Sequence, residues 1–150
     1  MKIGSKIKNF KAEITGINEF NLSDYSGKNI VIYFYPRDNT PGCTSEGEDF
    51  RDNFKSFKKK NTLIFGVSKD SIQSHENFKA KYNFPFELLS DPDEKICKIF
   101  DVIKEKSMYG KKYMGIERST FLINEKGKLI KEWRKVKVKD HASDVLSSII

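Results

Sequence analysis

Cys43 stands at a point in the sequence where a sulfur atom could be made reactive. It lies between a continuous apolar run that stops at Pro36 and a segment with helical periodicity that follows residue 44. A side chain at the first turn of a helix faces unpaired backbone N–H groups and the positive end of the helix dipole. Both favour a thiolate over a thiol, and the thiolate is the nucleophilic form of cysteine. The position therefore predicts thiol chemistry.

The neighbours of Cys43 suit a small polar pocket. Pro36 ends the strand, Gly42 lets the backbone approach closely, and the Thr40 hydroxyl can hydrogen-bond both a thiolate and a bound oxygen substrate. A lone free cysteine is more often a small buried hydrophobe. A turn that contains Pro36, Pro41 and Gly42 is not a core strand, however. We therefore favour the reactive interpretation.

The chain has one other cysteine, Cys97. It lies in a short apolar stretch with Ile96, Ile99 and Phe100, which suggests the packed face of a helix, so we expect Cys97 to pack. Two cysteines without paired spacing are too few for a disulfide framework and do not form a zinc motif.

The composition favours a folded domain with a solvated basic surface over a nucleic-acid reader. A length of 150 residues, 37% of them hydrophobic, predicts one domain over residues 1–150 with a core of its own. The net charge of +7 comes mainly from dispersed lysine, whereas nucleic-acid readers favour the bidentate guanidinium of arginine. We expect a solvated basic surface and no nucleic-acid partner. Neither a membrane helix nor a signal-peptide core is evident, so we expect a cytoplasmic protein without membrane contact.

Alternation and helical periodicity divide the chain into short elements. We expect an N-terminal β-hairpin within residues 10–22, strands at 29–35, 62–68 and 88–89, and a hairpin formed by 119–123 and 129–133. We expect helices at 44–60, 71–83, 93–100 and 140–150, while residues 104–115 are too irregular to assign. This order predicts an α/β protein with a central mixed β-sheet flanked by helices, which is a thioredoxin-like layout.

The segment around Cys43 resembles a known family. The pattern Pro36-x-x-x-Thr40-x-x-Cys43 is similar to the active-site signature of peroxiredoxins. The further segments 33–36, 40–46, 49–52, 89–91, 106–113 and 115–123 resemble the bacterioferritin comigratory protein (PrxQ) branch of that family, in order and over nearly the whole chain. The resemblance implies a single thioredoxin-like peroxiredoxin domain of the AhpC/TSA type.

Carried over position by position, the resemblance implies a peroxidase site. Cys43 would be the nucleophile that attacks hydrogen peroxide or an organic hydroperoxide, Thr40 would hydrogen-bond sulfur and peroxide, and Pro36 would shield the pocket. Arg118, brought from a later strand, would stabilise the thiolate and the developing charge. Gly42, Tyr35 and Glu46 would line the pocket, although an acidic residue in a first helical turn is also favourable without any catalytic role. The product would be a sulfenic acid on Cys43, formed without a metal or organic cofactor.

The sequence departs from the PrxQ pattern in one respect. Many members of that branch carry a resolving cysteine five residues after the nucleophile, and this chain has Glu48 there. We expect no resolving cysteine and a one-cysteine cycle, in which thioredoxin, glutaredoxin or a small thiol reduces the sulfenic acid. An atypical two-cysteine cycle through Cys97 stays open. It requires Cα atoms of Cys43 and Cys97 within about 4.4 to 6.8 Å, or local unfolding of the active-site helix, and the sequence does not give that distance. We expect a monomer or weak dimer.

Two other readings of the chain remain. A thiol-disulfide oxidoreductase would need a Cys-x-x-Cys pair, and Cys43 is followed instead by Thr44, Ser45 and Glu46. A redox-regulated binding protein or holdase could use the basic surface. His75 and His141 are flanked by charged residues without the spacing of a catalytic triad, so we expect both at the surface.

Overall fold

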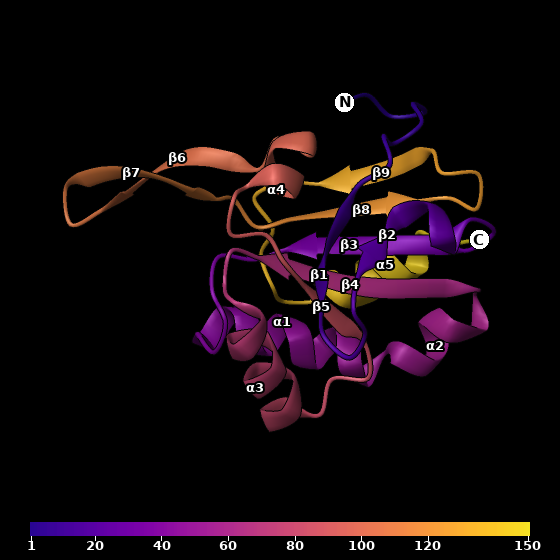
Figure 1. Cartoon of the computed structure of the whole chain (residues 1–150), viewed down its shortest axis with the longest axis horizontal. Coiled ribbons are helices and arrows are strands. Elements are labelled where there is room, and N and C mark those ends of the chain that lie inside the picture. The colour runs from indigo at the N-terminus through magenta and orange to yellow at the C-terminus, as the bar shows by residue number, and fades with distance from the viewer.

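The computed structural model describes all 150 residues and contains a central sheet of seven strands (Figure 1). In spatial order the strands are β2 (Phe20–Asn21), β1 (Lys11–Ile14), β5 (Glu87–Ser90), β4 (Thr62–Ser68), β3 (Asn29–Phe34), β8 (Ser119–Ile123) and β9 (Leu129–Trp133). β3, β4 and β5 are parallel, whereas β1 and β8 run antiparallel to their neighbours β5 and β3. The predicted mixed sheet is confirmed, together with its thioredoxin-like α/β class. No helix combines the length and the apolar composition that crossing a membrane would require.

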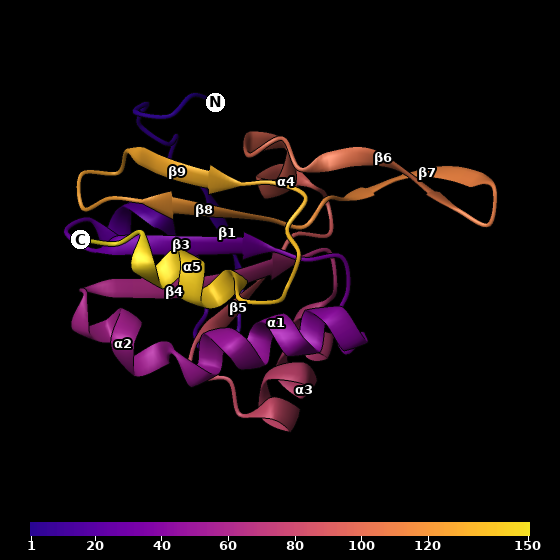
Figure 2. The ribbon, with the colours of Figure 1, turned by 180° about the vertical axis from the view of Figure 1, so that it is seen from behind.

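Helices cover both faces of this sheet. They are α1 (Pro41–Asp52), α2 (Phe54–Lys59), α3 (Ile72–Tyr82), α4 (Lys95–Ile99) and α5 (His141–Ser147), with a 3-10 helix η1 (Leu22–Tyr25) after β2. Figure 2 shows α1 and α5 in front of the sheet on the face that is hidden in Figure 1. α4 lies on the other face, where the N-terminal segment also packs.

The central strand β3 explains how the core is divided into two layers. Its residues are buried throughout because helices cover both faces, and successive side chains point to opposite faces. Ile32 and Phe34 belong to the cluster that packs on α4, whereas Tyr33 belongs to the cluster that packs on α1, α2 and α5. The sheet therefore separates two hydrophobic clusters, and each cluster contains one cysteine.

The predicted helix over residues 44–60 differs from the structure at its start and in its middle. α1 already begins at Pro41, because proline needs no N–H partner at the first helical position. The segment then breaks at Asn53, whose side-chain amide donates to the Asp49 carbonyl oxygen at 2.8 Å and closes α1. The other predicted helices and strands are present, and the strand over residues 62–68 has the expected bounds.

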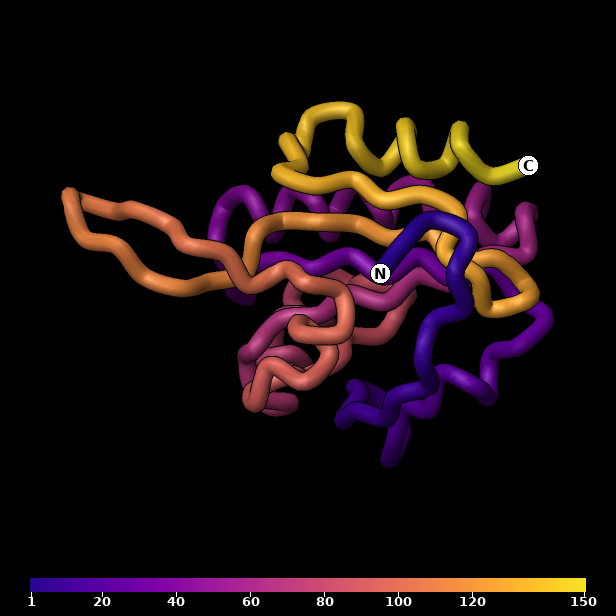
Figure 3. The backbone as a smooth tube through the Cα atoms, turned by 90° about the horizontal axis from the view of Figure 1, so that it is seen from above, coloured from indigo at the N-terminus to yellow at the C-terminus, as the bar shows by residue number.

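The segment left unassigned in the sequence is a regular hairpin. Strands β6 (Ile103–Met108) and β7 (Lys111–Ile116) form a separate two-stranded sheet that projects from the body of the molecule, as Figures 1 and 3 show. Most of its residues are exposed on both faces. The usual alternation of apolar and polar residues is therefore absent, which is why the periodicity gave no prediction.

Candidate active site

Cys43 occupies the third position of α1, directly beyond the carboxyl end of β3. Antiparallel pairing of β3 with β8 sets Phe34 opposite Ser119. The residue before Ser119 is Arg118, so this register brings Arg118 to the edge of the sheet at which α1 begins. The Cys43 residue is only 2% exposed and belongs to the cluster on the α1 face.

Arg118 joins Cys43 to a buried carboxylate. Its Nη2 donates to the Cys43 Sγ at 3.4 Å, and its Nη1 donates to Glu46 Oε1 at 2.7 Å. Cys43 and Glu46 lie three residues apart on α1, which places their side chains on the same side of the helix. The structure thus assembles Cys43, Glu46 and Arg118 into one group of interacting side chains.

Glu46 is 1% exposed, and its Oε2 has no hydrogen-bond partner. Burial raises the pKa of Glu46 from 4.5 to about 7, although the charge of Arg118 and its hydrogen bond act in the opposite direction. For Arg118 burial lowers the pKa, but the charges of Glu46 and Cys43 outweigh this effect and leave its pKa above the ordinary value. The guanidinium therefore keeps its charge, while Glu46 can gain a proton near neutral pH. Helix-dipole reasoning from the sequence did not anticipate this burial.

Gly42 makes the close approach of Arg118 possible. A Cβ atom built on Gly42 would lie 3.1 Å from Arg118 Nη2, which is closer than ordinary van der Waals contact. Any larger residue at this position would therefore push the guanidinium away from the start of α1 by a few tenths of an ångström. It is thus a protein side chain that comes close to the backbone at Gly42.

The remaining residues of the motif lie in the loop that precedes α1. Thr40 is the N-cap residue of α1, and its hydroxyl donates to the Arg37 carbonyl oxygen at 3.0 Å, with no hydrogen bond to Cys43. Pro36 is half-buried just after β3. Tyr35 is fully buried, and its hydroxyl donates to Asp38 Oδ1 at 2.6 Å.

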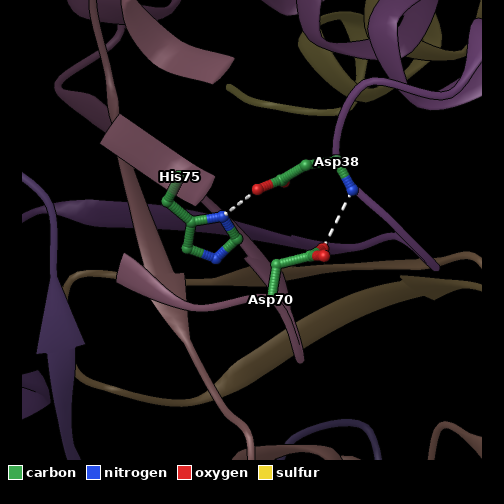
Figure 4. Close-up of side chains that lie close together, drawn as sticks. All are labelled: Asp38, Asp70 and His75. Carbon is green, nitrogen blue, oxygen red and sulfur yellow. Dashed lines mark hydrogen bonds and ion pairs between the residues drawn. The ribbon is translucent and has the colours of Figure 1, made fainter. Parts of the chain in front are cut away.

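Asp38 ties this loop to α3 and β4. Its Oδ2 lies 2.7 Å from His75 Nδ1, and its backbone N–H donates to Asp70 Oδ2 at 2.9 Å (Figure 4). The same Oδ2 accepts from the Ser74 hydroxyl at 2.8 Å. His75 Nε2 lies 2.9 Å from the Leu89 carbonyl oxygen. Because a carbonyl oxygen only accepts, Nε2 donates there, and a single proton lies between Nδ1 and the carboxylate. Both ring nitrogens are therefore engaged inside the protein.

The expectation that both histidines lie at the surface is wrong. His75 is completely buried, since it precedes the core residue Phe78 by three positions on α3 and shares its face. His141 is 5% exposed, its Nε2 lies 2.7 Å from Thr120 Oγ1, and burial lowers its pKa to about 4. The spacing from His75 to Phe78 was the available signal, because charged flanks do not reveal which helix face is buried.

Asp38, Asp70 and His75 are the three residues whose spacing could suit a metal, with ligand atoms within 4.8 Å of one another. Their ligand atoms are already engaged. Asp38 is bound by Ser74 and His75, and Asp70 Oδ2 accepts from the Ser68 hydroxyl at 2.6 Å as well as from the Asp38 N–H. The arrangement is therefore a hydrogen-bond network that holds the loop before Cys43.

Cys97 lies on the other side of the sheet from Cys43. It is fully buried in the cluster that contains Ile32 and Phe34, whereas Cys43 packs in the cluster that contains Tyr33. Burial, followed by a hydrogen bond and the charge of Asp91, raises the pKa of Cys97 far above its usual range. The packing of Cys97 is that of a small hydrophobe, and its thiol is kept protonated.

A thioredoxin-like sheet with a sulfur at a helix start, in contact with a guanidinium, defines a thiol-dependent oxidoreductase. The sequence matches the AhpC/TSA family over residues 3–132. It is 52% identical to peroxiredoxin Bcp of Bacillus subtilis over 149 residues, covering 99% of this chain and 95% of that protein.

Solved structures agree with this assignment. The chain resembles the bacterioferritin comigratory protein of Xanthomonas campestris with a TM-score of 0.89 at 50% identity, covering 93% of this chain and 89% of that one. A mutant of Xylella fastidiosa PrxQ matches with a TM-score of 0.93 at 46% identity, covering 98% and 94%. The chain belongs to the AhpC/TSA family, within its Bcp/PrxQ peroxiredoxins, and is a thiol peroxidase.

Proposed function

We propose that Cys43 is the nucleophile of this peroxidase and that it reduces hydrogen peroxide and organic hydroperoxides. The observation that carries the proposal is the contact between Arg118 Nη2 and the Cys43 Sγ, because it joins a sulfur at a helix start to a fixed positive charge. Cys97 is also the third residue of its helix, but the charged side chain beside it is the carboxylate of Asp91. The solved structure of the Xanthomonas campestris relative is described in terms of that protein's alkyl peroxide reduction activity. An alkyl hydroperoxide is therefore the substrate class that we favour for this chain.

The proposed reaction is an in-line displacement at oxygen. The Cys43 thiolate attacks the terminal oxygen of R–O–OH, a sulfur–oxygen bond forms, and the O–O bond breaks. Sulfur is oxidised to the sulfenic acid, and the departing alkoxide takes a proton from water to become the alcohol. Negative charge moves from sulfur to the leaving oxygen, and the Arg118 guanidinium, which donates to Sγ at 3.4 Å, would stabilise this charge as it develops.

Thr40 has a specific part in this proposal. Its single hydroxyl hydrogen is donated to the Arg37 carbonyl oxygen, so its oxygen is left to accept. A hydroperoxide carries one O–H donor, and Thr40 stands three residues before Cys43 at the entrance of α1. We infer that Thr40 accepts from the peroxide and so orients the terminal oxygen towards sulfur. Pro36, half-buried in the same loop, would shield that oxygen from water.

We also propose that the sulfenic acid is resolved by a thiol from outside the chain. Glu48 stands where a resolving cysteine would follow Cys43 on α1, and Cys97 packs on the opposite face of the sheet. A disulfide needs Cα atoms within about 4.4 to 6.8 Å, whereas the two cysteines belong to separate layers. An external thiol would displace water from the sulfenic acid to give a mixed disulfide, and a second thiol would then release Cys43.

Intact mass spectrometry tests both parts of the proposal. One equivalent of an alkyl hydroperoxide, added without reductant and in the presence of a sulfenic acid trap, should label wild type and Cys97→Ser once. Cys43→Ser should stay unlabelled. Label on Cys43→Ser would disprove the assignment of the nucleophile. A monomeric product that has lost two hydrogens, and that disappears in Cys97→Ser, would establish the two-cysteine cycle instead.

A further inference from the structure

The hairpin of β6 and β7 exposes an unusual amount of apolar surface. Four of its large apolar side chains are exposed, namely Met108 at 56%, Tyr109 at 97%, Tyr113 at 43% and Met114 at 61%. The hairpin pairs with no other strand, and an isolated two-stranded hairpin is only marginally stable in water. Exposed apolar residues gathered on a projecting element are typical of an interaction surface.

The strand register divides the hairpin into two faces of different chemistry. Lys106 pairs with Tyr113 and Met108 pairs with Lys111, so these four side chains share one face, which we call the lysine face. The opposite face carries Glu105, Ser107, Lys112 and Met114. The lysine face therefore combines basic and apolar side chains.

The outer parts of the two faces also differ in how their charges are compensated, whereas Lys104, at the base of the lysine face, pairs with Asp101 at 3.0 Å. On the opposite face, Lys112 Nζ lies 3.5 Å from Glu105 Oε1, so that charge is paired. Lys106 and Lys111 on the lysine face form no ion pair. A second copy of this chain would bring the same lysines and the same net charge of +7. Charge complementarity therefore favours an acidic partner over self-association.

The lysine face begins beside the active site. Lys106 Nζ donates to the Ile116 carbonyl oxygen at 2.8 Å, and Ile116 precedes Arg118 by only two residues. Burial, followed by the charge of Arg118, lowers the pKa of Lys106, while the charge of Cys43 raises it, so Lys106 lies within the electrostatic reach of both. Figure 1 shows the hairpin leaving the molecule at the end where α1 starts. A protein held by this hairpin would be close to Cys43.

We propose that the lysine face is the docking surface for an acidic protein thiol that reduces the Cys43 sulfenic acid. This inference rests on the proposed function, since the partner acts on the oxidised sulfur. The thiolate of the partner attacks the sulfenic sulfur, and hydroxide leaves and becomes water with one proton. The second thiol of the partner then breaks the mixed disulfide, so the partner is oxidised by two electrons and Cys43 is reduced. Met108 and Tyr113 supply apolar contact, while Lys106 and Lys111 supply charge.

The test separates the oxidation of Cys43 from its reduction. Wild type, Lys111→Glu, Met108→Ser/Tyr113→Ser and the matched control Lys112→Glu are each oxidised by an alkyl hydroperoxide. Turnover is then measured with an acidic bacterial thioredoxin and, separately, with dithiothreitol. We expect Lys111→Glu and Met108→Ser/Tyr113→Ser to lose about tenfold in kcat/KM for thioredoxin. Both should keep the wild-type rate of Cys43 oxidation and the wild-type rate of reduction by dithiothreitol. Lys112→Glu should behave as wild type, and the salt dependence of the thioredoxin rate should weaken in Lys111→Glu.

Each other outcome has a defined meaning. Three results would overturn the docking surface. The first is an unchanged kcat/KM for thioredoxin in both lysine-face variants, and the second is an equal loss of turnover with thioredoxin and with dithiothreitol. The third is a wild type that dithiothreitol reduces and thioredoxin does not. Sedimentation that shows a wild-type dimer dissociating in Met108→Ser/Tyr113→Ser with unchanged turnover would also overturn it, because the face would then join two copies. A wild type whose Cys43 is not oxidised by peroxide would contradict the proposed function instead, at the earlier step.

Discussion

Arg118 and Cys43 are 75 residues apart in the sequence, and yet Arg118 Nη2 lies 3.4 Å from the Cys43 Sγ. The antiparallel register of β3 and β8 produces this contact, because it sets Phe34 opposite Ser119 at the edge where α1 begins. The same guanidinium is held by the buried carboxylate of Glu46. Its position is therefore fixed by the sheet and by α1 before any substrate arrives, and a preorganised charge of this kind is effective in catalysis.

Replacing Arg118 should slow the oxidation of Cys43 without unfolding the protein. We expect Arg118→Ala to lower the second-order rate constant with an alkyl hydroperoxide by about 10²-fold, because one fixed donor to the developing charge is lost. The rate is measured by rapid quench with a thiol-alkylating reagent and intact mass. Arg37→Ala is the matched control, since Arg37 is exposed in the same loop. An equal loss of rate in both variants would show that positive charge anywhere near Cys43, and not the contact with Arg118, speeds the oxidation.

Adding a methyl group at Gly42 should displace the guanidinium. The Cβ atom would stand 3.1 Å from Arg118 Nη2, so we expect Gly42→Ala to lower the rate of Cys43 oxidation about tenfold while the free energy of unfolding stays close to that of wild type. Gly47→Ala on the same helix should lower the free energy of unfolding and leave the rate of Cys43 oxidation unchanged. The added Cβ would overlap the ring of Phe84, and overpacking costs about 1 to 3 kcal/mol of stability. Urea unfolding measures the change in stability, and the quench assay measures the change in oxidation rate. If Gly42→Ala and Gly47→Ala changed both quantities alike, both predictions would be contradicted.

The buried carboxyl of Glu46 should make stability depend on pH. Burial raises its pKa from 4.5 to about 7, so between these values the folded chain holds a proton that the unfolded chain has released. The stabilisation is complete below pH 4.5 and is lost as the pH rises through 7. Relative to Glu46→Gln, the wild-type free energy of unfolding should fall by about 3 kcal/mol over this window and then level off. Chemical denaturation of both proteins across this range measures the difference, and parallel profiles would show that Glu46 titrates normally.

Removing His75 should destabilise the fold. His75→Phe leaves the Asp38 carboxylate buried without its ring partner and the Leu89 carbonyl oxygen without a donor. Breaking a buried pair from one side costs about 3 to 5 kcal/mol. Ser74→Ala removes one hydrogen bond to the same carboxylate and should cost only about 1 kcal/mol. Equal costs, measured by urea unfolding, would indicate that the ring merely fills space.

The sequence predicted what is encoded locally. The apolar run that ends at Pro36 and the glycine before Cys43 were sufficient to predict a sulfur at a strand-to-helix turn. The position of Arg118 depends on a strand register, and only the resemblance to peroxiredoxins suggested it. The link between Asp38 and His75 joins a loop to α3 across 37 residues, and no local pattern encodes such a contact.

The hairpin of β6 and β7 was missed for a different reason. Strand prediction relies on one buried face, and this hairpin is exposed on both, so its residues show no alternation. The same exposure makes it a candidate docking surface. For Glu46 the sequence offered a place in the pocket or a favourable charge in the first helical turn, and its ion pair with Arg118 forms only when β8 joins the sheet.

The rate of Cys43 oxidation by an alkyl hydroperoxide, measured on Cys97→Ser by rapid mixing, is the most direct test of a peroxidase site built from Cys43 and Arg118. We expect oxidation orders of magnitude faster than that of a free thiol at the same pH, and a large part of that advantage should disappear in Cys97→Ser/Arg118→Ala. A rate equal to that of a free thiol, or one that does not change when Arg118 is removed, would contradict the account.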